Sequence, residues 1–236
     1  MLSQLLRSEW MKIKRKGLWF LTVLGPLGVV GLTMVNYGVR KDYLLSLSDD
    51  DWAIYLDNIL SLTPLALVLG IVILTSMMAS IENQTNAWKQ WLALPVSRSS
   101  VYLSKYVIAT TLLFVSSIIL GIGTTLYGLT LGLGDDIPWL RIMQVSFYPW
   151  LASQALIAFH LWVAVANNNQ GITVSIGVVG VILTFMAFFL PDWFLWKWPT
   201  LANDWNNPFI NIVLGISAGL LLFIAGMWHF CRKDVS

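Results

Sequence analysis

The chain has 236 residues, of which 57% are hydrophobic and only 11% are charged. Water-soluble domains are about 45–50% apolar and about 25% charged, so a soluble fold of this length would lack charged surface. The single cysteine excludes an intrachain disulfide and a cysteine-based metal site, and a net charge of +2 gives nucleic-acid binding no support. The 13 tryptophans are typical of a membrane protein that places them at its two interfaces.

The first 16 residues predict an amphipathic helix in the cytoplasmic interface. On a helix, one side carries Leu2, Leu5, Leu6, Glu9 and Ile13, and the other sides carry Arg7, Lys14 and Arg15. Apolar spacing of three and four residues with a basic opposite face favours a helix lying in the membrane plane.

Six apolar stretches follow, and each is near or above the ~20 residues that span a hydrocarbon core. We expect membrane-spanning helices at about 18–37, 59–81, 101–132, 145–166, 172–190 and 209–230. The fold class predicted is an all-α membrane protein with six transmembrane helices, forming a single domain over 1–236. With both termini in the cytoplasm, ten basic residues lie inside and four outside, as the positive-inside rule requires.

The cytoplasmic loop 82–100 predicts a short helix. Trp88, Trp91 and Leu92 share one helical face, Pro95 stops that helix, and a serine, Ser97 or Ser99, can cap the next one. The tryptophan rings could anchor the loop in the headgroup layer. Alternatively, the helix is a coupling element that fits a groove on a cytoplasmic ATPase, with Glu82, Lys89 and Arg98 supplying orientation.

The outer segment 191–208 contains four tryptophans and three prolines. Prolines at this density exclude a long helix, so we expect short elements seated in the outer headgroup layer. Two pairs of glycines, Gly128 with Gly132 and Gly215 with Gly219, have the spacing of close helix packing. They could pack helices within the chain or join two such bundles.

No catalytic or nucleotide-binding motif is present in the sequence. A P-loop, an H-E-x-x-H pair and ionisable groups near the bilayer midplane are all missing, and His160 is more typical of helix packing than of a proton relay. We therefore expect a chain that is not an enzyme and holds no metal or cofactor. Any transport would draw its free energy from another subunit.

Two stretches of sequence resemble a known family. W-K-Q-W-L-A-L-P-V-S-R-S-S-V-Y-L-S-K-Y, at 88–106, is similar to the hallmark of ABC-2 type transporter permeases, especially those of lantibiotic-immunity and bacitracin-export systems. S-E-W-M-K-I-K-R-K-G-L-W-F, at 8–20, is similar to the start of the same family.

The resemblance implies a partnership with two cytoplasmic ABC ATPase subunits, which bind ATP and Mg, and with a second permease chain, the same or different. It also implies residue roles near the cytoplasm. Glu82 would precede the coupling helix, residues from Asn86 to Leu94 would form it, the run from Pro95 to Arg98 would lead into the third span, and Lys105 would sit at the inner mouth. The residues assigned to ATPase coupling are thus Glu82, Asn86, Trp88, Lys89, Trp91, Leu92, Pro95 and Arg98.

The implied task is removal of an antimicrobial peptide, a lantibiotic first, from a bacterial plasma membrane. The outer segment could contact that peptide, or its rings could be plain interface anchors; these rings are Trp193, Trp196, Trp198 and Trp205. Another drug or a lipid-like substrate would keep the fold and change the cargo. A non-transporting scaffold or peptide sensor is the alternative from another class.

Overall fold

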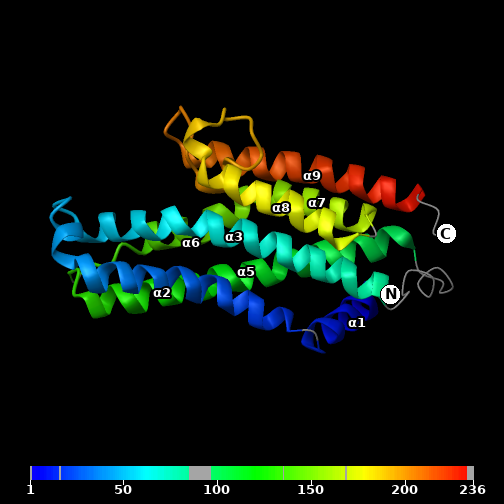
Figure 1. Ribbon diagram of the computed structural model, residues 1–236, viewed down its shortest axis with the longest axis horizontal. Coiled ribbons are helices and arrows are strands. Elements are labelled where there is room, and N and C mark those ends of the chain that lie inside the picture. The colour runs from blue at the N-terminus through cyan, green and yellow to red at the C-terminus, as the bar shows by residue number, and fades with distance from the viewer. Residues whose placement is uncertain (1, 16, 85–96, 135, 168, 233–236) are drawn as a thin grey trace.

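The computed structural model describes residues 2–15, 17–84, 97–134, 136–167 and 169–232. Within these ranges every regular element is a helix, which confirms the predicted all-α class. Helix α1 (Leu2–Arg15) and the last turn of α9 (Pro208–Arg232) lie at the same end of an elongated bundle (Figure 1). We call this the inner end and the opposite one the outer end; its assignment to the cytoplasm stays a prediction.

Among the described residues, five helical segments are long and apolar enough to cross a membrane. They are α2 (Leu18–Leu45), α3 (Asp51–Gln84), α5 (Arg98–Leu131), the pair α6 (Trp139–Ala152) and α7 (Gln154–Ala166), and α9. Several of them start or end beyond the predicted spans. Helix α3, for example, begins at Asp51 instead of 59, because the Asp50 carboxylate accepts a hydrogen bond from the Ala53 N–H (2.9 Å) and caps a polar first turn.

The predicted fifth span at 172–190 is wrong in extent. Helix α8 (Gln170–Phe185) has 16 residues, about 24 Å, which is short of the ~30 Å hydrocarbon core. A 3₁₀ turn, η1 (Ala187–Phe189), follows it. The helix ends early because the chain folds back over its last turn, where the Thr184 hydroxyl donates a hydrogen bond to the Trp196 carbonyl (3.1 Å).

The fourth predicted span is one passage built from two helices. Pro149 lies inside α6, and Ser153 separates α6 from α7. The Ser153 hydroxyl and the Gln154 side-chain amide both donate to the Trp150 carbonyl, at 2.8 and 2.9 Å. Together with a longer bond from the Ser153 N–H (3.3 Å), they satisfy the Trp150 carbonyl at a break that lies inside the membrane.

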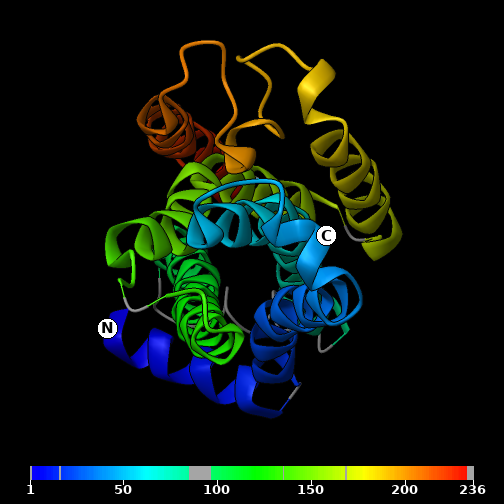
Figure 2. The same ribbon diagram turned by 90° about the vertical axis from the view of Figure 1, so that its left-hand side faces the viewer.

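Helix α1 lies across the inner end of the bundle instead of along its axis, as expected of an interfacial helix (Figure 2). Gly17, with φ of +73°, joins it to α2 in a left-handed conformation that favours glycine. Leu5 and Glu9 on α1 are buried, and α1 packs mainly against α5.

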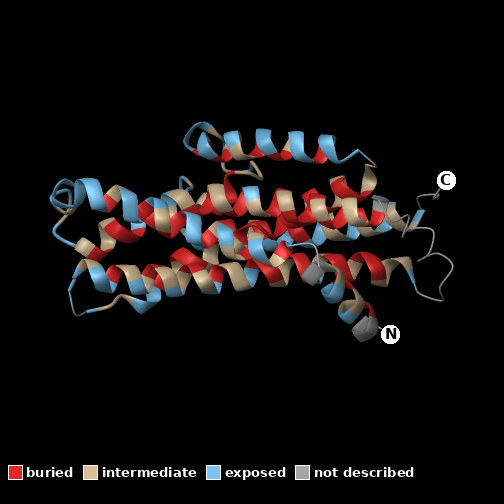
Figure 3. Ribbon diagram, turned by 60° about the horizontal axis from the view of Figure 1, so that its bottom comes forward, coloured by how far each residue is buried: buried red, intermediate tan, exposed pale blue. Residues whose placement is uncertain are grey.

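The buried core runs between α2, α3, α5 and α7, and exposed positions lie on the outward faces (Figure 3). Large apolar side chains on these outward faces are exposed, such as Phe20 on α2, Leu126 on α5 and Leu221 on α9. Apolar surface of this extent fits lipid and not water, since soluble monomers rarely expose large apolar patches. Helix α8 lies at the edge of the bundle, where it packs chiefly on α3 (Figure 2).

Candidate functional site

Four charged side chains from three helices meet at the inner end, and we call them the inner ion cluster: Glu9 and Lys12 of α1, Glu82 of α3 and Lys105 of α5. The Lys105 ammonium lies 3.1 Å from Glu9 Oε2 and 2.9 Å from Glu82 Oε1. The Lys12 ammonium lies 2.9 Å from Glu9 Oε1 and 2.7 Å from the same Glu82 oxygen. Each lysine therefore bridges both carboxylates, and the four groups form a closed ring.

The cluster is buried and electrically neutral. Glu82 and Lys105 are each 1% exposed and Glu9 is 3% exposed, whereas the Lys12 side chain is 28% exposed. Burying an isolated charge is costly, and a buried pair offsets that cost only when its geometry is good and its hydrogen bonds are made. Two positive and two negative charges at hydrogen-bond distance meet this condition. The arrangement fixes how α1, α3 and α5 sit against one another.

The electrostatics of Lys12 follow from this ring. Burial by itself lowers the pKa of its ammonium, but the Glu9 and Glu82 carboxylates outweigh that effect, so the pKa lies above its ordinary value. Lys12 therefore stays charged throughout the physiological range. The ring holds both of its positive charges at the inner end.

The sequence places these groups by local rules. Glu9 and Lys12 are three residues apart on α1, which puts them on adjoining positions of one helical face. Glu82 lies in the last turn of α3, and Lys105 lies two turns into α5. Helix α5 starts at Arg98, three residues before the predicted span. Ser97, one of the two serines predicted as possible caps, accepts a hydrogen bond from the Ser100 N–H (3.3 Å).

Of the eight residues assigned to ATPase coupling, six lie within the undescribed stretch 85–96 and two flank it. Asn86, Trp88, Lys89, Trp91, Leu92 and Pro95, and with them the coupling helix, lie outside the described residues. Glu82, which belongs to the inner ion cluster, lies just before this stretch. Arg98 lies just after the stretch, and its guanidinium donates a hydrogen bond to the Cys231 carbonyl at the end of α9 (3.1 Å). The inner ends of α3, α5 and α9 thus adjoin the two ends of this loop.

Lys105, predicted at the inner mouth, lies at the inner end with only 1% of its surface exposed, and its role there stays a prediction. Its side chain is enclosed by Glu9 and Glu82, which neutralise it. From the sequence, Glu9 was expected only as part of the interfacial helix, with no partner. A signal was present: Glu9 falls on the apolar face of α1, where a carboxylate needs a cation.

The glycines divide between packing and helix termination. A Cβ on Gly215 would lie 2.2 Å from the Ala152 carbonyl oxygen, and one on Gly219 would lie 2.9 Å from the Gln154 backbone, so α9 packs closely on the α6–α7 break. A Cβ on Gly128 would lie 2.5 Å from the Trp52 ring. Gly132 has no such neighbour within the described chain and ends α5 with φ of +68°, so it does not pack helices within this chain; a contact between two bundles stays a prediction.

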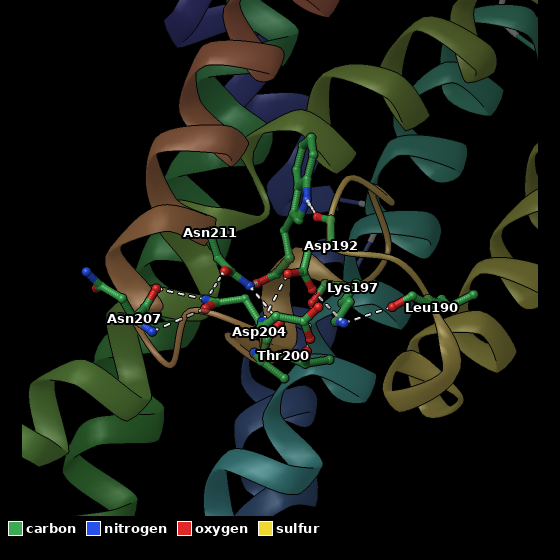
Figure 4. A network of polar contacts seen from close by, with 10 residues as sticks. Leu190, Asp192, Lys197, Thr200, Asp204, Asn207 and Asn211 are labelled. Atoms are coloured by element: carbon green, nitrogen blue, oxygen red, sulfur yellow. Dashed lines mark hydrogen bonds and ion pairs between the residues drawn. The ribbon is translucent and has the colours of Figure 1, made fainter.

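The outer segment, residues 191–208, forms turns and one 3₁₀ element, η2 (Trp198–Thr200), before α9 begins at its last residue, in agreement with the predicted short elements. A polar network holds this segment in shape (Figure 4). The Lys197 ammonium lies 2.7 Å from Asp192 Oδ1 and donates to the Leu190 carbonyl (2.8 Å). The Asn211 amide on α9 donates to the Trp198 carbonyl (3.2 Å) and ties η2 to that helix.

The four tryptophans of the outer segment have different surroundings. Trp193 and Trp205 are 74% and 60% exposed. Trp198 is buried, and its Nε1 donates to the Asp192 carbonyl (2.7 Å). Trp196 reaches between α7 and α8, with its ring edge-on to Phe159 and His160. Two of the four rings are therefore available to lipid or to a ligand.

His160 is fully buried in α7 beside this ring, and neither ring nitrogen has a hydrogen-bond partner among the described residues. No group of three or more His, Cys, Asp or Glu side chains in the described part of the chain could hold a metal ion.

Comparison with known proteins adds the family. Residues 5–190 match the family described as ABC-2 family transporter protein. No curated protein and no solved structure matches the chain. The matched range contains the whole inner ion cluster and the loop that follows α3.

Proposed function

Since the chain belongs to the ABC-2 family of transporter proteins and is a multi-pass permease subunit of an ABC transporter, we propose that it expels a lantibiotic or a similar antimicrobial peptide from the membrane. ABC-2 permeases are the membrane component of such transporters and work with ABC ATPase subunits. In this proposal two such ATPases, each with bound ATP and Mg, act on this chain and on a second permease chain in the plasma membrane.

The inner ion cluster carries the mechanistic part of the proposal. Glu82 is three residues before the stretch 85–96, in which we place the coupling helix. A displacement of that helix by the ATPases would pull on the end of α3. Because Glu82 forms ion pairs with Lys12 and Lys105, the same displacement would also move α1 and α5.

The outer segment supports the choice of a membrane-active peptide as cargo. Trp193 and Trp205 present exposed aromatic rings at a polar turn. Aromatic rings of this kind prefer the membrane interface, which is also where an amphipathic peptide resides. A peptide leaving the lipid would therefore meet these two rings first.

The proposal is tested with the tagged chain purified from its membrane together with the ATPase that accompanies it. In liposomes, nisin as the lantibiotic probe should stimulate ATP hydrolysis. The double variant Trp193→Ala, Trp205→Ala should lose this stimulation. The matched control is Trp139→Ala on α6, since Trp139 is 60% exposed but lies outside the outer segment, and it should keep the stimulation.

Each other outcome favours a named alternative. If Trp139→Ala loses the stimulation to the same extent, Trp193 and Trp205 act as interface anchors and not as peptide contacts. Stimulation by a hydrophobic drug or a lipid but not by nisin would keep the permease and change the cargo. Purification without any ATPase in several detergents would favour a scaffold or peptide sensor.

A further inference from the structure

A cavity of about 760 Å³ lies at the outer end, where α3 and α6 meet the outer segment. Its volume falls in the ~300–1,000 Å³ range of small-ligand sites. The polar part of its lining comes from three elements of the chain: Asp57 of α3, Arg141 and Gln144 of α6, and Lys197, Asn203 and Asp204 of the outer segment. Leu60, Tyr148 and Phe188 supply an apolar wall.

Two cations in this lining are held in place and still have donors to offer. Arg141 Nη2 lies 2.9 Å from Asp57 Oδ1, which uses one of the five N–H groups of the guanidinium. Lys197 uses two of its three ammonium hydrogens on Asp192 and Leu190. The remaining donors have no acceptor among the described residues. Arginine and lysine are the side chains that bind phosphate oxygens best, and arginine does so with two parallel hydrogen bonds.

Carboxylates stand beside these cations. The Asp204 carboxylate is exposed and accepts no hydrogen bond from a described residue, while its backbone N–H donates to Asp192 Oδ2 (3.0 Å) and fixes its position. Asp57 keeps one oxygen outside its pair with Arg141. The lining itself carries two positive and two negative groups, and Asp192, which pairs with Lys197 at 2.7 Å, adds a third carboxylate next to it. A purely anionic or purely cationic headgroup would face like charges, whereas a group that carries both a phosphate and an ammonium would not.

The surroundings place the cavity at the depth of lipid headgroups. Trp193 and Trp205 of the same segment are exposed aromatic rings of the kind that prefers the membrane interface. Phe188 in the cavity wall is 89% exposed and lies at the end of the apolar helix α8. Acyl chains can lie along this wall while the headgroup enters the cavity.

We propose that this cavity binds the headgroup of a zwitterionic aminophospholipid of the outer leaflet. Arg141 and Lys197 contact the phosphate, and Asp204 contacts the ammonium. Phe188 and Tyr148 contact the first carbons of the acyl chains. The site is separate from the inner ion cluster and requires neither ATP nor a peptide.

The test is a titration of the delipidated full-length chain with dihexanoyl-phosphatidylethanolamine, in which native mass spectrometry measures the bound fraction. Dihexanoyl-phosphatidylglycerol should bind at least about tenfold more weakly, because it lacks the ammonium. Arg141→Gln and Asp204→Asn should each weaken phosphatidylethanolamine binding by about tenfold. The matched controls are Arg40→Gln and Asp49→Asn, which make the same exchanges at outer-end residues that do not line the cavity, and they should bind like the wild type.

Equal binding of the two lipids, or equal binding by the cavity variants and their controls, would overturn the proposal. Free phosphoethanolamine should compete only at much higher concentration, because it makes no contact with the apolar wall. Competition at equal concentration would assign the cavity to a soluble ligand instead of a lipid. Arg141 and Asp204 are both exposed, so their variants should fold, and an unchanged elution volume in size-exclusion chromatography checks this.

Discussion

At the inner end two lysines and two carboxylates join α1, α3 and α5, whereas the outer end holds separate ion pairs. Arg141 and Asp57 form one of these pairs with side chains that are 47% and 58% exposed, and Lys197 and Asp192 form the other within a single loop. The chemistry is the same, but burial and connectivity differ. The inner cluster links three helices and is buried. Of the outer pairs, Arg141–Asp57 links α3 to α6 but is about half exposed, and Lys197–Asp192 is largely buried but lies within one loop. Ion pairs act as mechanical links only where they are buried and shared between elements.

The largest expected effect comes from breaking the inner ion cluster. Lys105→Met leaves two buried carboxylates with one lysine, and we expect a loss of about 3–5 kcal/mol in the free energy of unfolding. Reversible unfolding in mixed micelles with increasing SDS measures this. The control is Lys41→Met at the exposed outer end of α2, which should cost less than about 0.5 kcal/mol. A loss below about 1 kcal/mol for Lys105→Met would mean that the cluster is solvated.

Removing one lysine and one carboxylate together separates the effect of the cluster on the free energy of unfolding from its effect on coupling to the ATPase. Lys105→Met with Glu82→Met leaves the neutral pair of Glu9 and Lys12, so the free energy of unfolding should return to within about 1 kcal/mol of the wild type. Peptide-stimulated ATP hydrolysis by the associated ATPase should still fall by about tenfold, since α3 is no longer bonded to α1 and α5. Full stimulation in this double variant would argue against the cluster as the link.

The outer pair between α3 and α6 should matter far less for stability. Asp57→Asn removes the charge that faces Arg141, and because both side chains are about half exposed, we expect a loss of no more than about 1 kcal/mol. The effect should shrink further in 0.5 M salt, where exposed charges are screened. Unfolding in mixed micelles at two salt concentrations measures both. A salt-independent loss would indicate a buried pair.

The smallest effect concerns pH at the outer segment. The hydrogen bond from Lys197, with help from the Asp204 N–H, lowers the pKa of Asp192 below its ordinary value of about 3.9. A lowered pKa in the folded state means that the stabilisation is complete above the unfolded value and is lost as the pH falls through the folded value. The difference in Tm between the wild type and Asp192→Asn should therefore be constant from neutral pH to about 5 and shrink below about 4. A difference in Tm that grows as the pH falls would show that the pKa of Asp192 is not lowered in the folded state.

Much of the fold was predictable because membrane helices satisfy their backbone hydrogen bonds locally. Hydropathy located all six apolar helices, and one of the two serines predicted as caps, Ser97, is the N-cap of α5. The limits of those helices were less predictable. The α6–α7 break at Ser153 and the early end of α8 depend on contacts with Gly215 and Trp196, which lie far along the chain.

The sequence by itself determined that this protein is a helical membrane protein with an interfacial first helix and a turn-rich outer segment. Composition, apolar run length and proline placement act over a few residues or over the whole chain, so they need no knowledge of which helices are neighbours. Only the tertiary structure decided which charges meet. Glu9, Glu82 and Lys105 are separated by 96 positions at the widest, and their pairing follows from the packing of α1, α3 and α5. The same holds for the outer cavity, whose charged groups come from three separate elements.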